Sequence, residues 1–216
     1  MKNRFDLLVF DWDGTLFDSI DWIVASIQES AKACSYPTPS SKLARSVIGL
    51  NLDEAMQQLF PDISPQKKSD MVQTYQQHYT SRTMGADDLF HGVLPMLLQL
   101  RKAGYMLAVA TGKGRRGLRS ALNATGTAAY FDATRCADEA ESKPHPKMLL
   151  QLIEELRVTH SRVLMIGDSV HDLMMANNAG VASVAVACGA SDRMDLQRLK
   201  PILCLEETRK LVEILL

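Results

Sequence analysis

The chain has 216 residues, of which 46% are hydrophobic, and its 24 Lys and Arg nearly balance its 25 Asp and Glu, for a formal net charge of −1. That size and apolar content can support a substantial core, which predicts a soluble globular protein with one large domain or one domain carrying an insertion. The balanced charge gives no broad attraction for nucleic acid or for an anionic membrane surface, so we expect neither as a partner.

The first predicted element is a short strand, LLVF, at residues 7–10, and it ends at a pair of carboxylates, Asp11 and Asp13. An apolar run without alternation is typical of a strand that is covered on both faces, as in a parallel sheet. Asp6 and Asp11 interrupt the N-terminal stretch before a signal-peptide core could form. No apolar run approaches the ~20 residues that a membrane-spanning helix requires.

The next segment, residues 19–84, shows no convincing strand. Its apolar residues fall at helical spacing, as at Ile20, Ile23 and Ile27, and again at Met71, Tyr75 and Tyr79. This pattern predicts an all-helical insertion after the first strand.

From residue 85 onward, strand and helix patterns alternate. Apolar runs predict further strands at residues 106–110, 163–166, 183–187 and 201–205, and helical patterns occupy residues 93–102, 117–125 and 146–157. The alternation predicts an α/β fold, a Rossmann-like parallel sheet with helices on both faces. The predicted domains are an α/β core of residues 1–18 and 85–216 and a small helical domain of residues 19–84.

The cysteines indicate a reducing environment. Cys34, Cys136, Cys188 and Cys204 form no CxxC pair and show no metal-ligand spacing, and a chain with a good core does not need disulfide bonds. We therefore expect a cytoplasmic location. The sequence gives no prediction of the oligomeric state.

Polar residues follow three of the predicted strands, at the sheet edge where ligands of α/β proteins bind. They are Asp11 with Asp13, then Thr111 with Gly112, then Asp168, and Asp172 comes four residues after Asp168. Carboxylates that repel one another need a cation, and an all-oxygen ligand set favours Mg²⁺ together with a phosphate group.

Beside a metal ion and a phosphate group, Asp11 and Asp13 can have different catalytic roles. Asp11 can act as a nucleophile without a base, and Asp13 can hold a proton for a leaving alcohol and later take one from water. Candidate phosphate contacts are Gly14, Thr111, Gly112 and Lys143.

Four stretches in order, DWDGTL at Asp11, ATGK at Thr111, SKPHP at Lys143 and GDSVHD at Asp168, resemble the motifs of the haloacid dehalogenase superfamily, and of its phosphoglycolate phosphatase-like branch in particular. The resemblance implies that Asp11 is the nucleophile and a Mg²⁺ ligand. It also implies that Asp13 is the acid/base and ligates through its backbone carbonyl, and that Asp168 binds the metal. Asp172 would support the site, and residues 19–84 would form a cap over small phosphorylated substrates.

Several residues have other interpretations. Lys143 could be a surface lysine, and Asp172 could simply complement a helix N-terminus. Arg45, in a stretch that resembles a substrate-contacting cap loop, could be an exposed arginine, and Lys113 is a second candidate for substrate contact. Residues 112–117 also match the dinucleotide fingerprint GxGxxG, a weak signal that leaves the acidic residues unexplained.

The sequence thus predicts a Mg²⁺-dependent phosphatase that hydrolyses a small organic phosphate monoester, with phosphoglycolate as the leading substrate. A phosphomutase of the β-phosphoglucomutase type is the alternative enzyme. A non-catalytic phosphate-binding regulatory protein on the same fold is the alternative outside catalysis, although binding alone would not need Asp13.

Overall fold

A six-stranded parallel sheet forms the centre of the protein in the computed structural model, which describes residues 4–216. The strands are β1 (Leu7–Phe10), β2 (Met106–Ala110), β3 (Ala133–Arg135), β4 (Val163–Gly167), β5 (Ala182–Val186) and β6 (Leu203–Leu205). Their spatial order is β3-β2-β1-β4-β5-β6, so β1 lies between β2 and β4. The predicted Rossmann-like α/β fold is confirmed.

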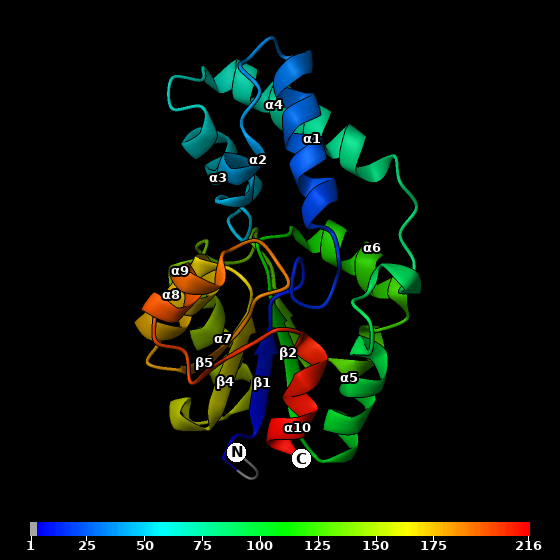
Figure 1. The fold of residues 1–216 in the computed structure, drawn as a ribbon, viewed down its shortest axis with the longest axis vertical. Coiled ribbons are helices and arrows are strands. Elements are labelled where there is room, and N and C mark those ends of the chain that lie inside the picture. The colour runs from blue at the N-terminus through cyan, green and yellow to red at the C-terminus, as the bar shows by residue number, and fades with distance from the viewer. Residues whose placement is uncertain (1–3) are drawn as a thin grey trace.

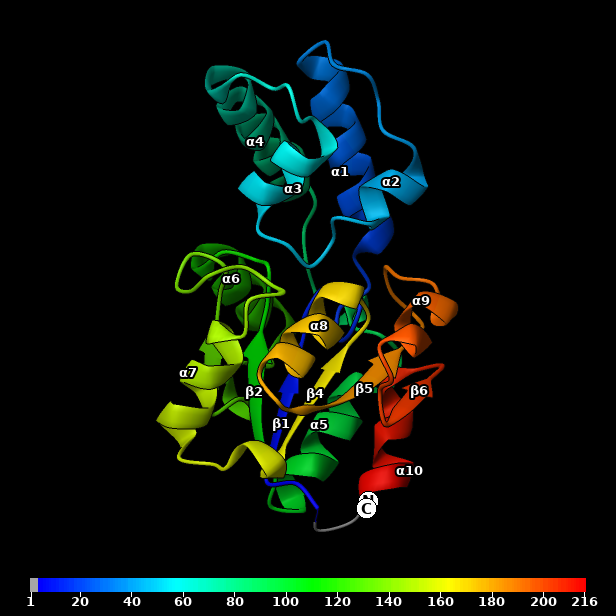
Figure 2. The ribbon, with the colours of Figure 1, turned by 90° about the vertical axis from the view of Figure 1, so that its left-hand side faces the viewer.

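Helices cover both faces of the sheet, which explains the unbroken apolar runs. Along β1, Leu8 and Phe10 belong to one buried cluster and Leu7 and Val9 to another. The first face is covered by α5 (Val93–Lys102), α6 (Arg115–Thr125) and α10 (Leu211–Leu215), and the second by α7 (Lys147–Leu156) and α8 (Val170–Asn178) (Figure 2). Helix α9 (Arg193–Arg198) lies beside β5 and β6, and short 3₁₀ helices occupy Ala86–Asp88, Ala128–Tyr130, His160–Arg162 and Thr208–Lys210.

A second group of helices stands beyond the carboxyl ends of the strands (Figure 1). It comprises α1 (Ile20–Ala33), α2 (Ser41–Arg45), α3 (Leu52–Leu59) and α4 (Pro65–Thr80), all within residues 19–84. The stacked rings of Trp22 and Tyr79, with centroids 4.2 Å apart, join α1 to α4. We call residues 20–80 the helical unit.

The two chain segments that join the helical unit to the sheet run side by side. The Phe90 N–H donates to the Leu16 carbonyl at 3.0 Å, and the Asp18 N–H donates to the Asp88 carbonyl at 2.8 Å. These paired linkers place the helical unit directly over the sheet edge where β1 ends.

The structure adds one strand that the sequence patterns did not indicate. β3 has only three residues, Ala133–Arg135, and lies at an edge of the sheet with one strand neighbour, so it needs no long apolar run. Helix α6 also begins at Arg115, two residues before the predicted start, because Gly117 is accommodated inside it.

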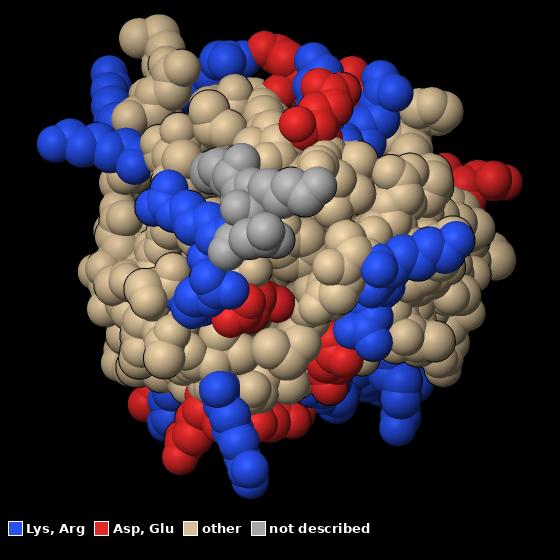
Figure 3. Space-filling model, turned by 90° about the horizontal axis from the view of Figure 1, so that it is seen from below, with Lys and Arg blue, Asp and Glu red and all other residues tan. Residues whose placement is uncertain are grey.

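The surface agrees with the balanced composition. At the end of the molecule away from the helical unit, basic and acidic side chains are interspersed (Figure 3). Within residues 4–216, none of the helices combines the length and the apolar character needed to cross a bilayer.

Candidate active site

Three acidic side chains converge at the carboxyl edge of the sheet. Asp11 follows β1, Asp168 follows β4, and Asp172 lies in the first turn of α8. Phe10 pairs with Ile166 across the two strands, and this register brings the residues that follow them to the same level. Each of the three carboxylates offers an oxygen within 4.8 Å of the other two, and all three are buried.

Lys143 is the cation of this cluster. Its Nζ lies 2.7 Å from Asp11 Oδ1 and 2.6 Å from Asp172 Oδ1, and its side chain is fully buried. The alternative of a surface lysine is therefore wrong. Burial alone would lower the pKa of Lys143, but Asp11 and Asp172 raise it above its ordinary value, so the ammonium stays charged.

The acidic cluster still carries excess negative charge. Burial raises the pKa of Asp11 well above its usual range, and the charges of Asp172 and Asp168 add to this effect although Lys143 opposes it. Burial also raises the pKa of Asp168, to about 7. Three carboxylates facing one ammonium are an unfavourable arrangement that a divalent cation would relieve.

The chemistry of the donors fits Mg²⁺. The cluster presents oxygen atoms only, which a small hard cation prefers. Two glycines leave room around Asp168, since a Cβ at Gly14 would lie 2.3 Å from its Oδ2 and one at Gly189 would lie 2.0 Å away. Gly14 also has a φ of +82°, which a glycine adopts without strain.

Asp13 lies apart from this cluster and is held by both of its carboxylate oxygens. Ser19 Oγ donates to Oδ1 at 2.7 Å, and Lys113 Nζ lies 3.0 Å from Oδ2. Ser19 occupies the N-cap position of α1, but its hydroxyl does not cap that helix. Asp13 is therefore oriented by one residue at the base of the helical unit and by one residue from the loop after β2.

Several residues that orient the acids could not be recognised from the sequence. Thr15 Oγ1 donates to Asp168 Oδ1 at 2.7 Å, and the Ala190 N–H donates to Asp168 Oδ2 at 2.7 Å. Ser169 Oγ donates to Asp172 Oδ2 at 2.6 Å within a capping box at the start of α8. Asp172 thus contributes to its helix N-terminus and binds Lys143 as well. Thr15, Ser19 and Ser169 were visible only as hydroxyl residues next to the motif acids.

The loop after β2 contacts the helical unit closely. Thr111 is buried, and its Oγ1 accepts a hydrogen bond from the Lys113 N–H at 3.2 Å. A Cβ at Gly112 would lie 2.4 Å from the Leu50 carbonyl oxygen and 2.5 Å from that of Gly49. The backbone of the helical unit therefore packs against the glycine that opens the GxGxxG match.

Residues 45–51 are seated on the core by polar contacts. Arg45 Nη2 lies 2.5 Å from Asp21 Oδ1, and its Nη1 donates to the Gly189 carbonyl at 3.4 Å. The Asn51 N–H donates to Ser142 Oγ at 3.0 Å, and a ring nitrogen of His171 is hydrogen-bonded to the Ser46 carbonyl at 2.9 Å. Arg45 thus lies at the boundary between the helical unit and the sheet.

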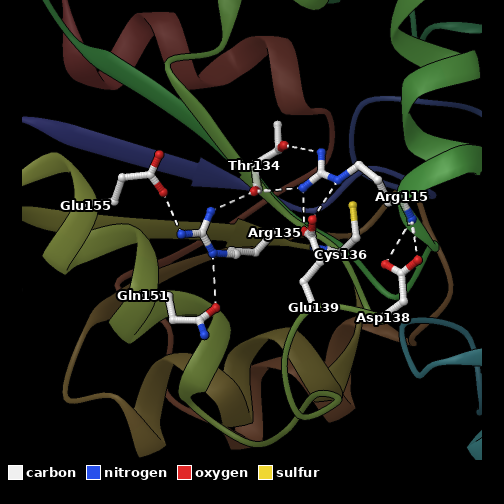
Figure 4. A network of polar contacts seen from close by, with 8 residues as sticks. All are labelled: Arg115, Thr134, Arg135, Cys136, Asp138, Glu139, Gln151 and Glu155. Atoms are coloured by element: carbon white, nitrogen blue, oxygen red, sulfur yellow. Dashed lines mark hydrogen bonds and ion pairs between the residues drawn. The ribbon is translucent and has the colours of Figure 1, made fainter.

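A second group of possible metal ligands, Cys136, Asp138 and Glu139, serves a structural purpose (Figure 4). The Arg115 guanidinium pairs with Glu139, and the Arg115 N–H donates to Asp138 Oδ1 at 3.0 Å. Burial raises the pKa of the Cys136 thiol to about 12, which disfavours the thiolate that a metal would need. These contacts attach α6 to the chain that follows β3.

The chain is similar in sequence and in fold to known phosphatases. Residues 8–186 match a family model described as haloacid dehalogenase-like hydrolase. A probable phosphatase, IndB, from Dickeya dadantii is 33% identical over 90% of this chain and 86% of its own length. A phosphoglycolate phosphatase from Vibrio cholerae is 28% identical over 97% of this chain and 96% of its own. The crystal structure of a predicted phosphoglycolate phosphatase from Haemophilus somnus superposes with a TM-score of 0.86 at 25% identity, covering 98% of each chain.

Proposed function

The chain belongs to the haloacid dehalogenase-like hydrolase family and is a phosphoric monoester hydrolase, and from this premise we propose that it hydrolyses a small organic phosphate such as phosphoglycolate through an aspartyl-phosphate on Asp11. The observation that carries the proposal is the state of the Asp11 carboxylate. Lys143 holds its Oδ1, and among residues 4–216 no hydrogen-bond donor lies on its Oδ2. One oxygen is fixed and the other is available for attack.

In the first step, Asp11 Oδ2 forms a bond to phosphorus, and the bond from phosphorus to the alcohol oxygen breaks. Asp13 gives its proton to that oxygen, so the alcohol leaves neutral. In the second step, water attacks the same phosphorus, Asp13 takes the water proton, and the bond from phosphorus to Asp11 breaks. The products are inorganic phosphate and the original Asp11 carboxylate.

Other side chains bind the phosphoryl group. Lys143 offers positive charge beside Asp11, and Thr111 with the backbone at Gly14 and Gly112 offers hydrogen-bond donors. Phosphatases of this family generally use Mg²⁺, and Asp11, Asp168 and the Asp13 carbonyl would hold it here, with Asp172 in support. The ion would neutralise the charge of the carboxylates and of the phosphate oxygens.

The helical segment and two basic residues also have roles in the proposed phosphatase. Residues 19–84 act as the cap domain on a core of residues 1–18 and 85–216, and Arg45 and Lys113 contact the substrate. A cap that closes over the site surrounds the substrate and selects the leaving group. The four free thiols support the cytoplasm as the location.

The direct test is phosphate release from phosphoglycolate and from an aryl phosphate, with Mg²⁺ and after chelation. We expect release from both that stops without the metal ion. Conversion of a sugar phosphate to its isomer without phosphate release would favour the phosphomutase, and binding of phosphate without turnover would favour the regulatory protein.

A further inference from the structure

The loop that follows Asp11 is held by a residue from the C-terminal part of the chain. The N–H groups of residues 15–17 all donate to the Trp12 carbonyl, at 3.3, 3.0 and 3.0 Å, so the loop closes on itself. The Thr15 carbonyl lies outside these bonds and accepts a hydrogen bond from Thr208 Oγ1 at 2.6 Å. Within residues 4–216, this carbonyl has no other hydrogen-bond donor.

Thr208 is anchored on both sides along the chain. It opens the 3₁₀ helix Thr208–Lys210 between β6 and α10, and its side chain is buried. On one side β6 pairs with β5, and on the other the α10 side chains Leu211 and Leu215 are fully buried in the core. The Thr208 hydroxyl is therefore a fixed donor for the Thr15 carbonyl.

Thr15 also holds the proposed metal ligand Asp168. Thr15 Oγ1 donates to Asp168 Oδ1 at 2.7 Å, and the Ala190 N–H donates to Oδ2 at 2.7 Å. Asp168 is fully buried, so these two donors set the orientation of its carboxylate. Each oxygen can accept about two bonds and keeps a lone pair for a cation. Thr208, Thr15 and Asp168 thus form one continuous chain of hydrogen bonds.

The space between this loop and the carboxylate is small. A Cβ at Gly14 would lie 2.3 Å from Asp168 Oδ2. Cys188 Sγ lies 3.6 Å from the Gly14 carbonyl oxygen and 3.9 Å from Thr208 Oγ1, so it contacts the same loop from the same side. A shift of the loop would therefore change the position of Asp168.

A buried hydroxyl of this kind can have two roles. It can satisfy a buried carbonyl, in which case its loss destabilises the fold alone. It can also hold that carbonyl's residue in position, in which case its loss reaches the groups that the residue orients. The second role applies here because Thr15 accepts a hydrogen bond at its carbonyl and donates one to Asp168 from its hydroxyl.

We propose that Thr208 is a positioning residue for the metal site, in that it fixes the Thr15 backbone and Thr15 in turn orients Asp168 for Mg²⁺. The inference rests on the metal site of the proposed function. It extends that site to Thr208, which lies beyond residues 8–186, the part of the chain that matches the family model. Partners of metal-binding side chains typically contribute about 10–100-fold to metal affinity. Because Thr208 acts one contact farther from the ion, we expect a smaller contribution from it.

The experiment measures Mg²⁺ binding in the absence of substrate. The Kd for Mg²⁺ is obtained by calorimetry and from the rise of Tm with MgCl₂, compared with KCl at the same ionic strength. The variants are T208A, T208S, T15A and the double variant T15A/T208A. T125A is the matched control, because Thr125 Oγ1 is also buried and donates to a backbone carbonyl, that of Ala121, at 2.8 Å at the C-terminal end of α6.

We expect T208A to weaken Mg²⁺ binding about 3–10-fold, and T208S to stay within about 2-fold of the wild type because serine keeps the hydroxyl. T15A should weaken binding about 10–100-fold. The double variant should match T15A within about 2-fold, because Thr208 acts through Thr15. T125A should lower Tm and leave the Kd unchanged. If T208A fails to fold, T208C takes its place, since a thiol is a weaker donor, and the same direction of change is expected.

Three results would overturn the role of Thr208 and leave the metal site in place. A wild-type Kd in T208A, even with a lower Tm, would show that the hydroxyl serves stability alone. Additive losses in the double variant would show that Thr208 does not act through Thr15. An equal loss of affinity in T125A would show that the Kd follows stability in general. A wild type that binds no Mg²⁺ would instead reject the proposed metal site itself.

Discussion

Replacement of Asp11 by asparagine should abolish turnover and leave the fold intact. The amide oxygen can still accept the Lys143 hydrogen bond, but the side chain loses the charge that makes it a nucleophile. At an effective dielectric near 20, removing the charge loses about 6 kcal/mol of attraction to Lys143 at 2.7 Å. Above pH 7, where Asp168 is ionised, it also removes repulsion of at least about 3.5 kcal/mol from each of two carboxylates within 4.8 Å. The lost attraction and the lost repulsion nearly cancel, and the net effect slightly stabilises the folded state of D11N.

D11N should therefore lose at least about 10⁴-fold in kcat, while the metal-free protein keeps its free energy of unfolding within about 1 kcal/mol or gains slightly. Phosphate release measures the first quantity, and urea unfolding in the presence of a chelator measures the second. D62N, at an exposed residue of the helical unit, is the matched control and should match the wild type in both. A D11N enzyme with more than a tenth of wild-type turnover would remove Asp11 from the nucleophilic role, and a loss of stability above about 3 kcal/mol would refute the charge balance.

Three further predictions concern the supports of the site. Burial raises the pKa of Asp168 to about 7 from 3.8, so the metal-free folded state keeps a proton that the unfolded chain loses, and stability falls as the pH rises from about 4 to 7. In chelator, the free energy of unfolding of D168N relative to the wild type should therefore rise by about 4 kcal/mol between pH 4 and pH 8 in urea unfolding. Poorer hydrogen bonding of the amide adds a cost that does not change with pH, and a stability difference that is constant over this range would contradict the prediction. S19A should lower kcat about 10-fold with little change in KM, because the hydrogen bond that orients Asp13 is lost. The control S41A, at the exposed start of α2, should leave kcat unchanged. An unchanged kcat in S19A would show that Asp13 does not need the Ser19 hydrogen bond. G112A should raise KM about 10-fold in steady-state assays, because the added methyl group would lie 2.4 Å from the Leu50 carbonyl oxygen and displace residues 45–51. An unchanged KM would mean that the close contact between Gly112 and Leu50 is not needed during turnover.

The sheet could be predicted from the sequence because its central strands are buried on both faces. β1, β2 and β4 therefore show apolar runs that end at polar residues, and parallel strands must bring those ends to one edge. The convergence of Asp11, Asp168 and Asp172 follows from this rule. β3 was not predicted because an edge strand of three residues has no long apolar run.

The contacts around Asp13 could not be predicted in the same way. They depend on how the helical unit docks on the sheet, and no periodicity encodes that. Tyr79 was read as one of several apolar positions of a helix, yet its hydroxyl meets Lys113. The charge of Lys143 made it a candidate, but no pattern in the sequence shows that its loop returns to β1, and its complete burial is a property of the folded chain.

The paired linkers have a consequence for the timing of the reaction. Ser19 stands where one linker enters α1, and Tyr79 stands at the end of α4 just before the other. Any swing of the helical unit about the linkers would draw Ser19 from Asp13 and Tyr79 from Lys113 together. Both hydrogen bonds are therefore present together only while the helical unit is docked on the sheet, so the proposed acid/base, Asp13, would be held in place only in the docked arrangement.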